Sequence, residues 1–128
     1  MKGRSLLKFN YLVNDDLYKC MLRFSRRLNR KELKILDVGC GQRPYYKLFG
    51  NKASFYVGID ITKGKADALA EAEALPFKGE SFDLILLIGV LGFTRNPLEE
   101  MGEDNRVLKK NGVFFLTFPG DWKRSDER

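Results

Sequence analysis

The feature that most constrains this chain is a short apolar segment that ends abruptly in a glycine turn. Residues 35–38 are apolar except for Asp37, and Gly39, Cys40 and Gly41 follow directly. A run of this length bounded by glycines is typical of a buried strand in a parallel sheet. Glycines at the carboxyl end of such a strand let the backbone turn sharply and let a ligand approach closely. The sequence therefore predicts an α/β fold with a ligand site at this turn.

A second acidic residue, Asp60, ends a second predicted strand at residues 54–59. A carboxylate at a strand end beside a glycine turn is how open α/β folds hold the hydroxyls of an adenosine ribose. A dinucleotide fingerprint would need a further glycine at position 44, where this chain has Pro44. Asp37 also suits a cationic or amine-bearing ligand better than a pyrophosphate. The sequence thus disfavours a nicotinamide cofactor.

Four segments in order resemble one protein family. Residues 36–41 read LDVGCG, residues 56–60 read YVGID, residues 72–86 read AEALPFKGESFDLIL, and residues 106–112 read RVLKKNG. Over residues 34–120 the chain is similar to the class I S-adenosylmethionine (SAM)-dependent methyltransferases, and most to their small-molecule, type 11-like branch. The resemblance implies an α/β class with a Rossmann-like, open, mostly parallel sheet in the order 3-2-1-4-5, truncated after the fifth strand.

The resemblance also implies how the cofactor is held. Asp37 would face the methionyl amine through water, Asp60 the ribose hydroxyls, and Glu71 the adenine amino group. The glycines permit close backbone approach, and the other residues flank the adenine or the methionine end. The predicted SAM-binding residues are Asp37, Gly39, Gly41, Asp60, Ile61, Glu71, Ala72, Ile88 and Gly89. Arg43 replaces the family's frequent third glycine, and two interpretations stay open: it pairs with the methionyl carboxylate, or it points to solvent.

The predicted function is methyl transfer from SAM to a small-molecule acceptor. The alternative is a catalytically inactive SAM-binding or interaction module that needs a partner to complete the sheet. Relatives commonly read VLEHV after the fourth strand, whereas residues 90–94 here read VLGFT, and Asp104 stands where relatives carry an apolar residue. No catalytic residue is assigned. Because the chain has no histidine and two cysteines, no metal site is predicted.

The predicted fifth strand, residues 113–118, is apolar on both faces and no further strand follows it. Natural sheet edges are usually protected by charge, proline or a bulge, and this run has none of them. The sequence therefore predicts a homodimer, or a partner chain, that pairs with this edge. The competing interpretation is that this chain is a fragment of a longer methyltransferase.

The net charge of +6 is concentrated near the N-terminus, since residues 1–34 hold 10 Lys/Arg and 3 Asp/Glu. A helix that starts at residues 14–16 would place Leu17, Met21, Phe24 and Leu28 on one face, with basic residues opposite. We interpret the basic face as solvated. Nucleic acid is disfavoured because no aromatic residues are interleaved with the charges, and contact with an anionic membrane surface is not favoured.

The chain is expected to be one domain, residues 1–128. It would comprise a basic helical extension (1–33), a cofactor-binding core (34–120) and a tail (121–128). A short helix is predicted over residues 44–49 and a fourth strand over 82–88. The third strand, near residues 67–70, is either short and irregular or not parallel, because only six residues separate it from Asp60. A helix is predicted from Pro97 to Leu108, ended by Asn111 and Gly112. The low cysteine content predicts a cytoplasmic protein.

Overall fold

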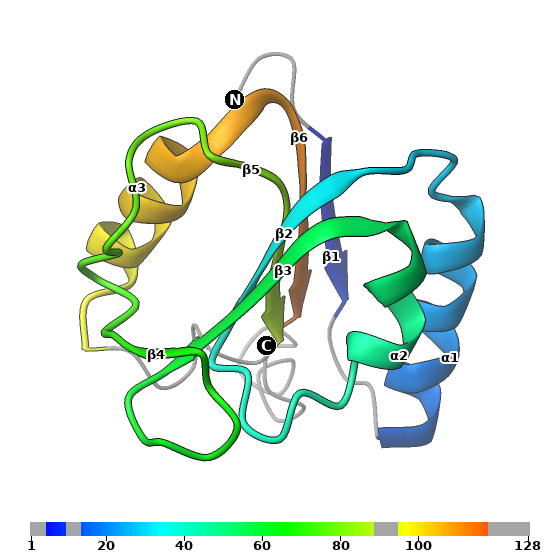
Figure 1. Ribbon diagram of the computed structural model, residues 1–128, viewed down its shortest axis with the longest axis horizontal. Helices are drawn as coiled ribbons and strands as arrows, with labels where there is room; N and C mark the ends of the chain where they lie inside the picture. The colour runs from blue at the N-terminus through cyan, green and yellow to red at the C-terminus, as the bar shows by residue number, and fades with distance from the viewer. Residues whose placement is uncertain (1–4, 10–13, 89–94, 118–128) are drawn as a thin grey trace, which may run out of the picture.

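The computed structural model describes residues 5–9, 14–88 and 95–117 of this chain. They form a six-stranded sheet in the order β1-β6-β5-β2-β3-β4, and every strand pair is parallel (Figure 1). The five strands that the sequence predicted lie in the order 3-2-1-4-5, which confirms the fold class. The strands are β1 (Ser5–Phe9), β2 (Leu33–Val38), β3 (Ala53–Asp60), β4 (Ala68–Leu69), β5 (Phe82–Ile88) and β6 (Leu108–Thr117).

Helices cover both faces of the sheet. The helices α1 (Asn14–Arg27) and α2 (Tyr46–Phe49) lie on one face, where a 3₁₀ turn (Gly50–Lys52) follows α2. The helix α3 (Pro97–Val107) lies on the other (Figure 1). Both faces of β2 and β5 are therefore buried, as the continuous apolar runs in these strands predict. No helix among the described residues is both long enough and apolar enough to cross a membrane.

The apolar face of α1 packs on the sheet as predicted. Met21 is fully buried, and the Phe24 ring lies 5.9 Å from that of Phe49 and 5.0 Å from that of Phe115. Arg26 and Arg27 are exposed on the opposite side. The helix is thus held by its apolar stripe and presents its basic residues to solvent.

We expect Phe24→Ala to lower the free energy of unfolding by about 3 kcal/mol, because the Phe24 ring packs against both the Phe49 and the Phe115 rings. The matched control is the double substitution Arg26→Ala with Arg27→Ala. It should change stability by less than about 1 kcal/mol, because exposed charges contribute little. Urea unfolding of both variants tests the orientation of α1, and the reverse ranking would contradict it.

The structure corrects the predicted end of α3. This helix ends at Val107, and Leu108 already has the extended backbone of β6 (φ −86°, ψ 134°). Residues 109–112, expected to form a helix cap, belong to that strand. A Cβ atom at Gly112 would lie 2.5 Å from Leu108 Cδ1, so the glycine makes room for the Leu108 side chain and does not terminate a helix.

The prediction of an open edge at residues 113–118 is wrong. β1 pairs with β6 in parallel, with Ser5 opposite Val113 and Phe9 opposite Thr117. The backbone groups on that side of β6 therefore have partners within the same chain, and Phe118 lies outside the described residues. The argument for a homodimer or partner chain at this edge fails for the same reason.

The third predicted strand is as short as expected. β4 has two residues, and Ile59 and Asp60 pair with Ala68 and Leu69. Residues 61–67 form the connection from β3, with no helix in it. This connection lies directly beside the glycine turn, which makes it part of the candidate site.

Candidate functional site

The glycine turn at the end of β2 is fastened to β3. The amides of Gly39 and Cys40 both donate to the carbonyl of Ile59, at 2.9 and 3.0 Å. Gly39 and Gly41 have φ angles of 70° and 53°, a region that side-chain-bearing residues avoid. The two glycines therefore allow the chain to double back at the carboxyl edge of the sheet, where ligands bind in open α/β folds.

Asp60 lies at the end of β3 and touches this turn. Its Oδ2 accepts a hydrogen bond from the Gly41 amide at 2.9 Å, and its Oδ1 accepts one from the Ile61 amide at 2.7 Å. The structure thus brings Asp60 and Gly41 together, as the sequence predicted. Each oxygen has one backbone donor, which fixes the carboxylate and leaves further lone pairs for hydroxyl donors of a ligand.

Asp37 is buried beneath the turn. It is 2% exposed, and its Oδ2 accepts a hydrogen bond from the Tyr56 hydroxyl at 2.7 Å. Burial raises the pKa of Asp37 to about 6, although the Tyr56 hydrogen bond and the nearby Arg43 guanidinium lower it. A change of pH near neutrality therefore changes the ionised fraction of this carboxyl group.

We expect Tyr56→Phe to raise the pKa of Asp37 above its value of about 6. The substitution removes the hydroxyl donor that stabilises the ionised carboxylate but keeps the ring. Carboxyl carbon chemical shifts followed by NMR against pH would measure this pKa. An unchanged or lowered pKa would show that the hydrogen bond does not support the charge.

Arg43 follows the turn and has a φ angle of 60°, so it keeps a glycine-like backbone. Its Nη1 lies 2.6 Å from Asp67 Oδ2, and its guanidinium stacks 5.3 Å from the Tyr46 ring and 5.2 Å from the Tyr56 ring. The side chain is 20% exposed, so it does not point freely into solvent.

Asp67 is a functional candidate that the sequence analysis missed. Its Oδ2 also accepts the Gly58 amide at 2.8 Å, and the Lys65 amide donates to the carbonyl of Gly41 at 3.1 Å. Residues 61–67 are thereby fastened to the glycine turn. An acid before a two-residue strand carries no distinctive sequence signal, because its partner Arg43 is 24 residues away.

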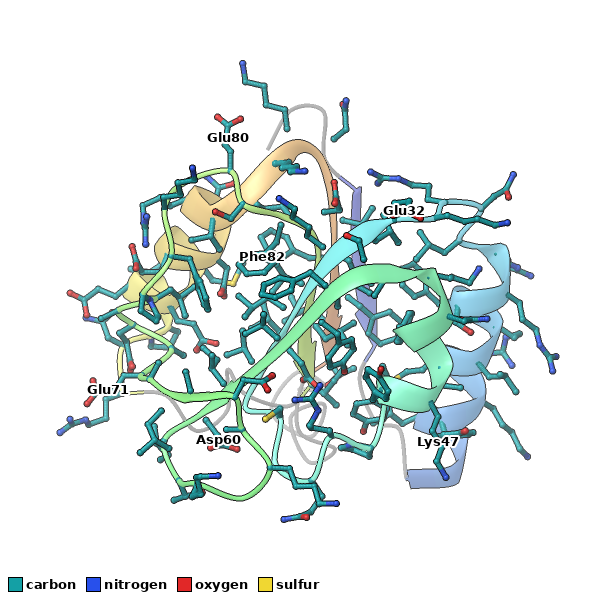
Figure 2. All side chains as sticks on the ribbon, viewed as in Figure 1. Glu32, Lys47, Asp60, Glu71, Glu80 and Phe82 are labelled. Carbon is teal, nitrogen blue, oxygen red and sulfur yellow. The ribbon has the colours of Figure 1, made fainter. Side chains whose placement is uncertain are left out.

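Glu71 lies at the same edge as Asp60, and Figure 2 shows both labelled side chains there. The Ala70 amide donates to the carbonyl of Asp60 at 2.9 Å, which joins the two segments. Glu71 is exposed and starts a tight turn closed by the Ala74 amide at 3.0 Å. Ala72 is partly buried against the core. The two residues predicted for the adenine edge therefore follow directly after the strand that flanks Asp60.

Two further predicted residues, Ile61 and Ile88, lie at strand ends along this edge. Ile61 is 70% exposed beside Asp60, and Leu69 is 61% exposed on the adjacent strand, so an apolar surface adjoins the carboxylate. Ile88 ends β5 and is half-buried. Gly89 and the divergent residues 90–94 lie outside the described part of the chain.

The described residues offer neither a metal centre nor an activated thiol. They contain no group of three His, Cys, Asp or Glu side chains placed to hold a metal ion. Burial raises the pKa of Cys40 to about 11, so its thiol stays protonated at neutral pH. What the site offers is the acidic side chains of Asp37, Asp60, Asp67 and Glu71, a fixed glycine backbone and an apolar rim.

Comparison with known proteins points to one family. The family described as "Methyltransferase domain" matches residues 36–116. The uncharacterized protein MJ1252 of Methanocaldococcus jannaschii is 35% identical over 116 residues, which covers 80% of this chain and 46% of that protein. A tRNA U34 carboxymethyltransferase of Saccharophagus degradans is 30% identical over 104 residues, covering 67% of this chain and 32% of that protein.

Solved structures are similar as well. One of them is a SAM-dependent methyltransferase of Thermotoga maritima, described as a possible histamine N-methyltransferase, with a TM-score of 0.61 and 25% identity. The match covers 78% of this chain and 50% of that chain. The present chain thus spans half or less of the length of these relatives.

Proposed function

Because this chain belongs to the methyltransferase domain family, we propose that it binds SAM where β2, β3 and β4 end. We further propose that the whole protein transfers the methyl group to a small-molecule acceptor. The observation that carries the proposal is the Asp60 carboxylate, held against the Gly41 amide and joined through its own carbonyl to the segment that bears Glu71. A carboxylate at the end of β3 suits the ribose hydroxyls of an adenosine, and Glu71 on the joined segment is an acceptor for its amino group.

The other described residues fit the rest of the cofactor. Asp37 would balance the positive charge of the methionyl amine, and Arg43 stands beside it as the nearest described cation of the turn. Ile61 offers an apolar surface to the adenine ring, and Ala72 offers backbone groups to its edge. Gly39 and Gly41 leave room for the methionyl chain, and Ile88 with Gly89 would close the methionine end.

Bound SAM supplies a methyl group that its sulfonium centre already makes electrophilic. The chain's contribution is then to fix the cofactor and to exclude alternative orientations, since alignment supplies much of the acceleration in such a displacement. Asp60 and Glu71 hold the adenosine end, and Asp37 holds the methionyl end. We assign no general base, because none of the described acids has been shown to face an acceptor.

A small-molecule acceptor is favoured over RNA. The Thermotoga maritima protein is described as a possible histamine N-methyltransferase, and the Saccharophagus degradans protein as a tRNA U34 carboxymethyltransferase. The basic residues of α1 lie on the face away from its apolar stripe, on a helix that covers the sheet face and not its carboxyl edge. The two described cysteines are both free thiols, which suits the cytoplasmic location that we propose.

The inactive-module alternative loses one of its arguments. It depended in part on an unpaired strand at residues 113–118, and β1 pairs with that strand in the same chain. An intact arrangement of Asp37, Asp60 and the glycine turn favours cofactor binding in either case.

We expect Asp60→Ala to weaken binding of S-adenosylhomocysteine at least tenfold. The substitution removes a charge-assisted acceptor of the ribose hydroxyls, and each such hydrogen bond contributes roughly 1.5–3 kcal/mol. Calorimetric titration measures the dissociation constant. Asp60→Asn is the milder variant, because its amide oxygen can still accept one backbone hydrogen bond.

The matched control is Glu80→Gln, an exposed acid at the opposite end of the sheet (Figure 2), which should leave the affinity unchanged. NAD should not bind the unmodified chain. The assignment of Asp60 is wrong if the Asp60→Ala chain folds and binds S-adenosylhomocysteine as tightly as the unmodified chain.

A further inference from the structure

Two side chains in the C-terminal half of α3 form hydrogen bonds with the segment that follows Glu71. Arg106 donates from Nη1 to the carbonyl of Phe77 at 2.8 Å and from Nη2 to the carbonyl of Leu75 at 3.0 Å. Glu103 Oε1 accepts the Leu75 amide at 2.8 Å. Both backbone groups of Leu75 are therefore bonded to side chains of α3.

Arg106 is itself held in place by Glu103. Its Nε lies 2.8 Å from Glu103 Oε2 and its Nη2 lies 3.0 Å from Oε1, a two-point contact between planar groups. Hydrogen bonding to Arg106 holds the pKa of Glu103 below its usual range, and the same pairing raises the pKa of Arg106. The guanidinium thus has a fixed plane, and its remaining donors point at two carbonyls of one loop.

The loop that Arg106 contacts is short, and it is also held at its other end. Leu75 is 5% exposed and lies in the core, and the Phe77 ring meets the Phe82 ring edge to face at 5.0 Å. On the opposite side, Ala70 is bonded to Asp60. Only the turn from Glu71 to Ala74 lies between these two attachments, so its position is set by both of them.

We propose that Arg106, oriented by Glu103, is a positioning residue for recognition of the adenine amino group. It makes this contribution through the loop, because its guanidinium bonds the Glu103 carboxylate and the backbone carbonyls of Leu75 and Phe77. When the loop is held, Glu71 and Ala72 face the adenine edge beside Asp60. When the Arg106 hydrogen bonds are lost, the turn becomes more mobile, and Glu71 is no longer held in one position to accept from the adenine amino group. This inference rests on the proposed binding of SAM.

A positioning role differs measurably from a purely stabilising one. The Arg106 and Glu103 side chains are 41% and 24% exposed, so their ion pair is well solvated and contributes little to overall stability. Placement of a recognition group, in contrast, has to be accurate to a fraction of an ångström. The effect should therefore appear in the choice between bases, with only a small change in melting temperature.

The experiment compares two ligands by calorimetric titration. S-Adenosylhomocysteine carries the adenine amino group, and S-inosylhomocysteine has an oxygen in its place. We expect the unmodified chain to prefer the adenosyl ligand by about tenfold or more, as for one hydrogen bond to a charged group. Arg106→Leu should reduce this preference to about threefold or less. Arg106→Lys should fall between the two, because its donors come from one nitrogen, whereas arginine reaches Glu103 and the two carbonyls from three nitrogens of a planar group.

Glu103→Gln provides a second variant if Arg106→Leu does not fold, since its amide can still accept from Leu75 but holds Arg106 less firmly. The control is Arg26→Leu, an exposed arginine on α1, which should leave the preference intact. A preference that persists in folded Arg106 and Glu103 variants overturns the inference and leaves SAM binding standing. So does equal binding of both ligands by the unmodified chain. If that chain binds neither ligand, the proposed function fails and this inference fails with it.

Discussion

Asp104→Asn should make the protein more stable than the unmodified chain at pH 8.5 and should flatten the dependence of its stability on pH. Asp104 and Glu100 are both fully buried, one turn apart on the sheet-facing side of α3. Neither Asp104 oxygen has a hydrogen-bond partner among the described residues. Burial, with smaller contributions from Glu100 and Glu103, raises the pKa of Asp104 to about 8.

The sign of the effect follows from proton binding. Between the ordinary carboxyl pKa of 3.8 and the folded value of about 8, the folded state keeps a proton that the unfolded state has released. The contribution of Asp104 to the free energy of unfolding is therefore fully present below pH 3.8. It is lost progressively as the pH rises from there through about 8. The loss is about 1.4 kcal/mol for each pH unit in this window. Over the whole window it amounts to as much as about 6 kcal/mol, a large part of a small domain's stability.

Urea unfolding at pH 5 and pH 8.5 tests this expectation. The unmodified chain should be markedly less stable at pH 8.5, and Asp104→Asn should remove most of the difference. Asp37, whose pKa is also raised, contributes in the same direction and should account for a remainder. Glu99→Gln is the control, since Glu99 is exposed on the same helix. Equal stability of the unmodified chain at both pH values would show that Asp104 is not a buried, uncompensated carboxyl group.

Asp104 shows which structural features a local sequence pattern can predict and which it cannot. Asp104 is unusual because relatives carry an apolar residue at this position, and the structure buries it completely. The sequence could not show that Glu100 shares its surroundings. Helical spacing predicts that two residues four apart share a face, but which face points to the sheet depends on tertiary packing.

The central part of the site was predictable because its signals are local. Strand patterns end at Asp60 and at the glycine turn, and parallel strands bring their carboxyl ends to one edge. The structure accordingly joins Asp60 to Gly41. The hydrogen bonds from Arg106 to the carbonyls of Leu75 and Phe77 were not predictable. They link backbone groups to a side chain about 30 residues later, so neither segment carries a pattern that indicates them.

The largest error concerned β1, for a related reason. Ser5–Phe9 is too short to show a period, and its partner residues begin at Val113. Pairing between segments so far apart leaves no local trace. The apolar composition of β6 was correctly taken to require burial and pairing, but the partner strand comes from the opposite end of the same chain.

Removing β1 should therefore create the open edge that the sequence alone had predicted. We expect a chain lacking residues 1–13 to self-associate or precipitate at micromolar concentration, whereas the full chain stays monomeric. The deletion leaves the backbone of residues 113–117 unpaired on one side, in a strand whose Phe114, Phe115 and Leu116 are buried and carry no protective charge. Each lost backbone hydrogen bond costs roughly 1 kcal/mol, so the melting temperature should also fall.

Size-exclusion chromatography with light scattering measures the association, and two further chains isolate its cause. Deleting residues 1–4 alone should have no effect, since β1 begins at Ser5. Replacing both Leu6 and Leu7 by proline keeps the full length but weakens the pairing. One of two consecutive strand residues directs its amide toward β6, and proline has no amide hydrogen to donate. This double variant should associate like the long deletion. If both chains remain monomeric and as stable as the full chain, β1 does not protect β6, and the edge must be shielded by some other part of the protein.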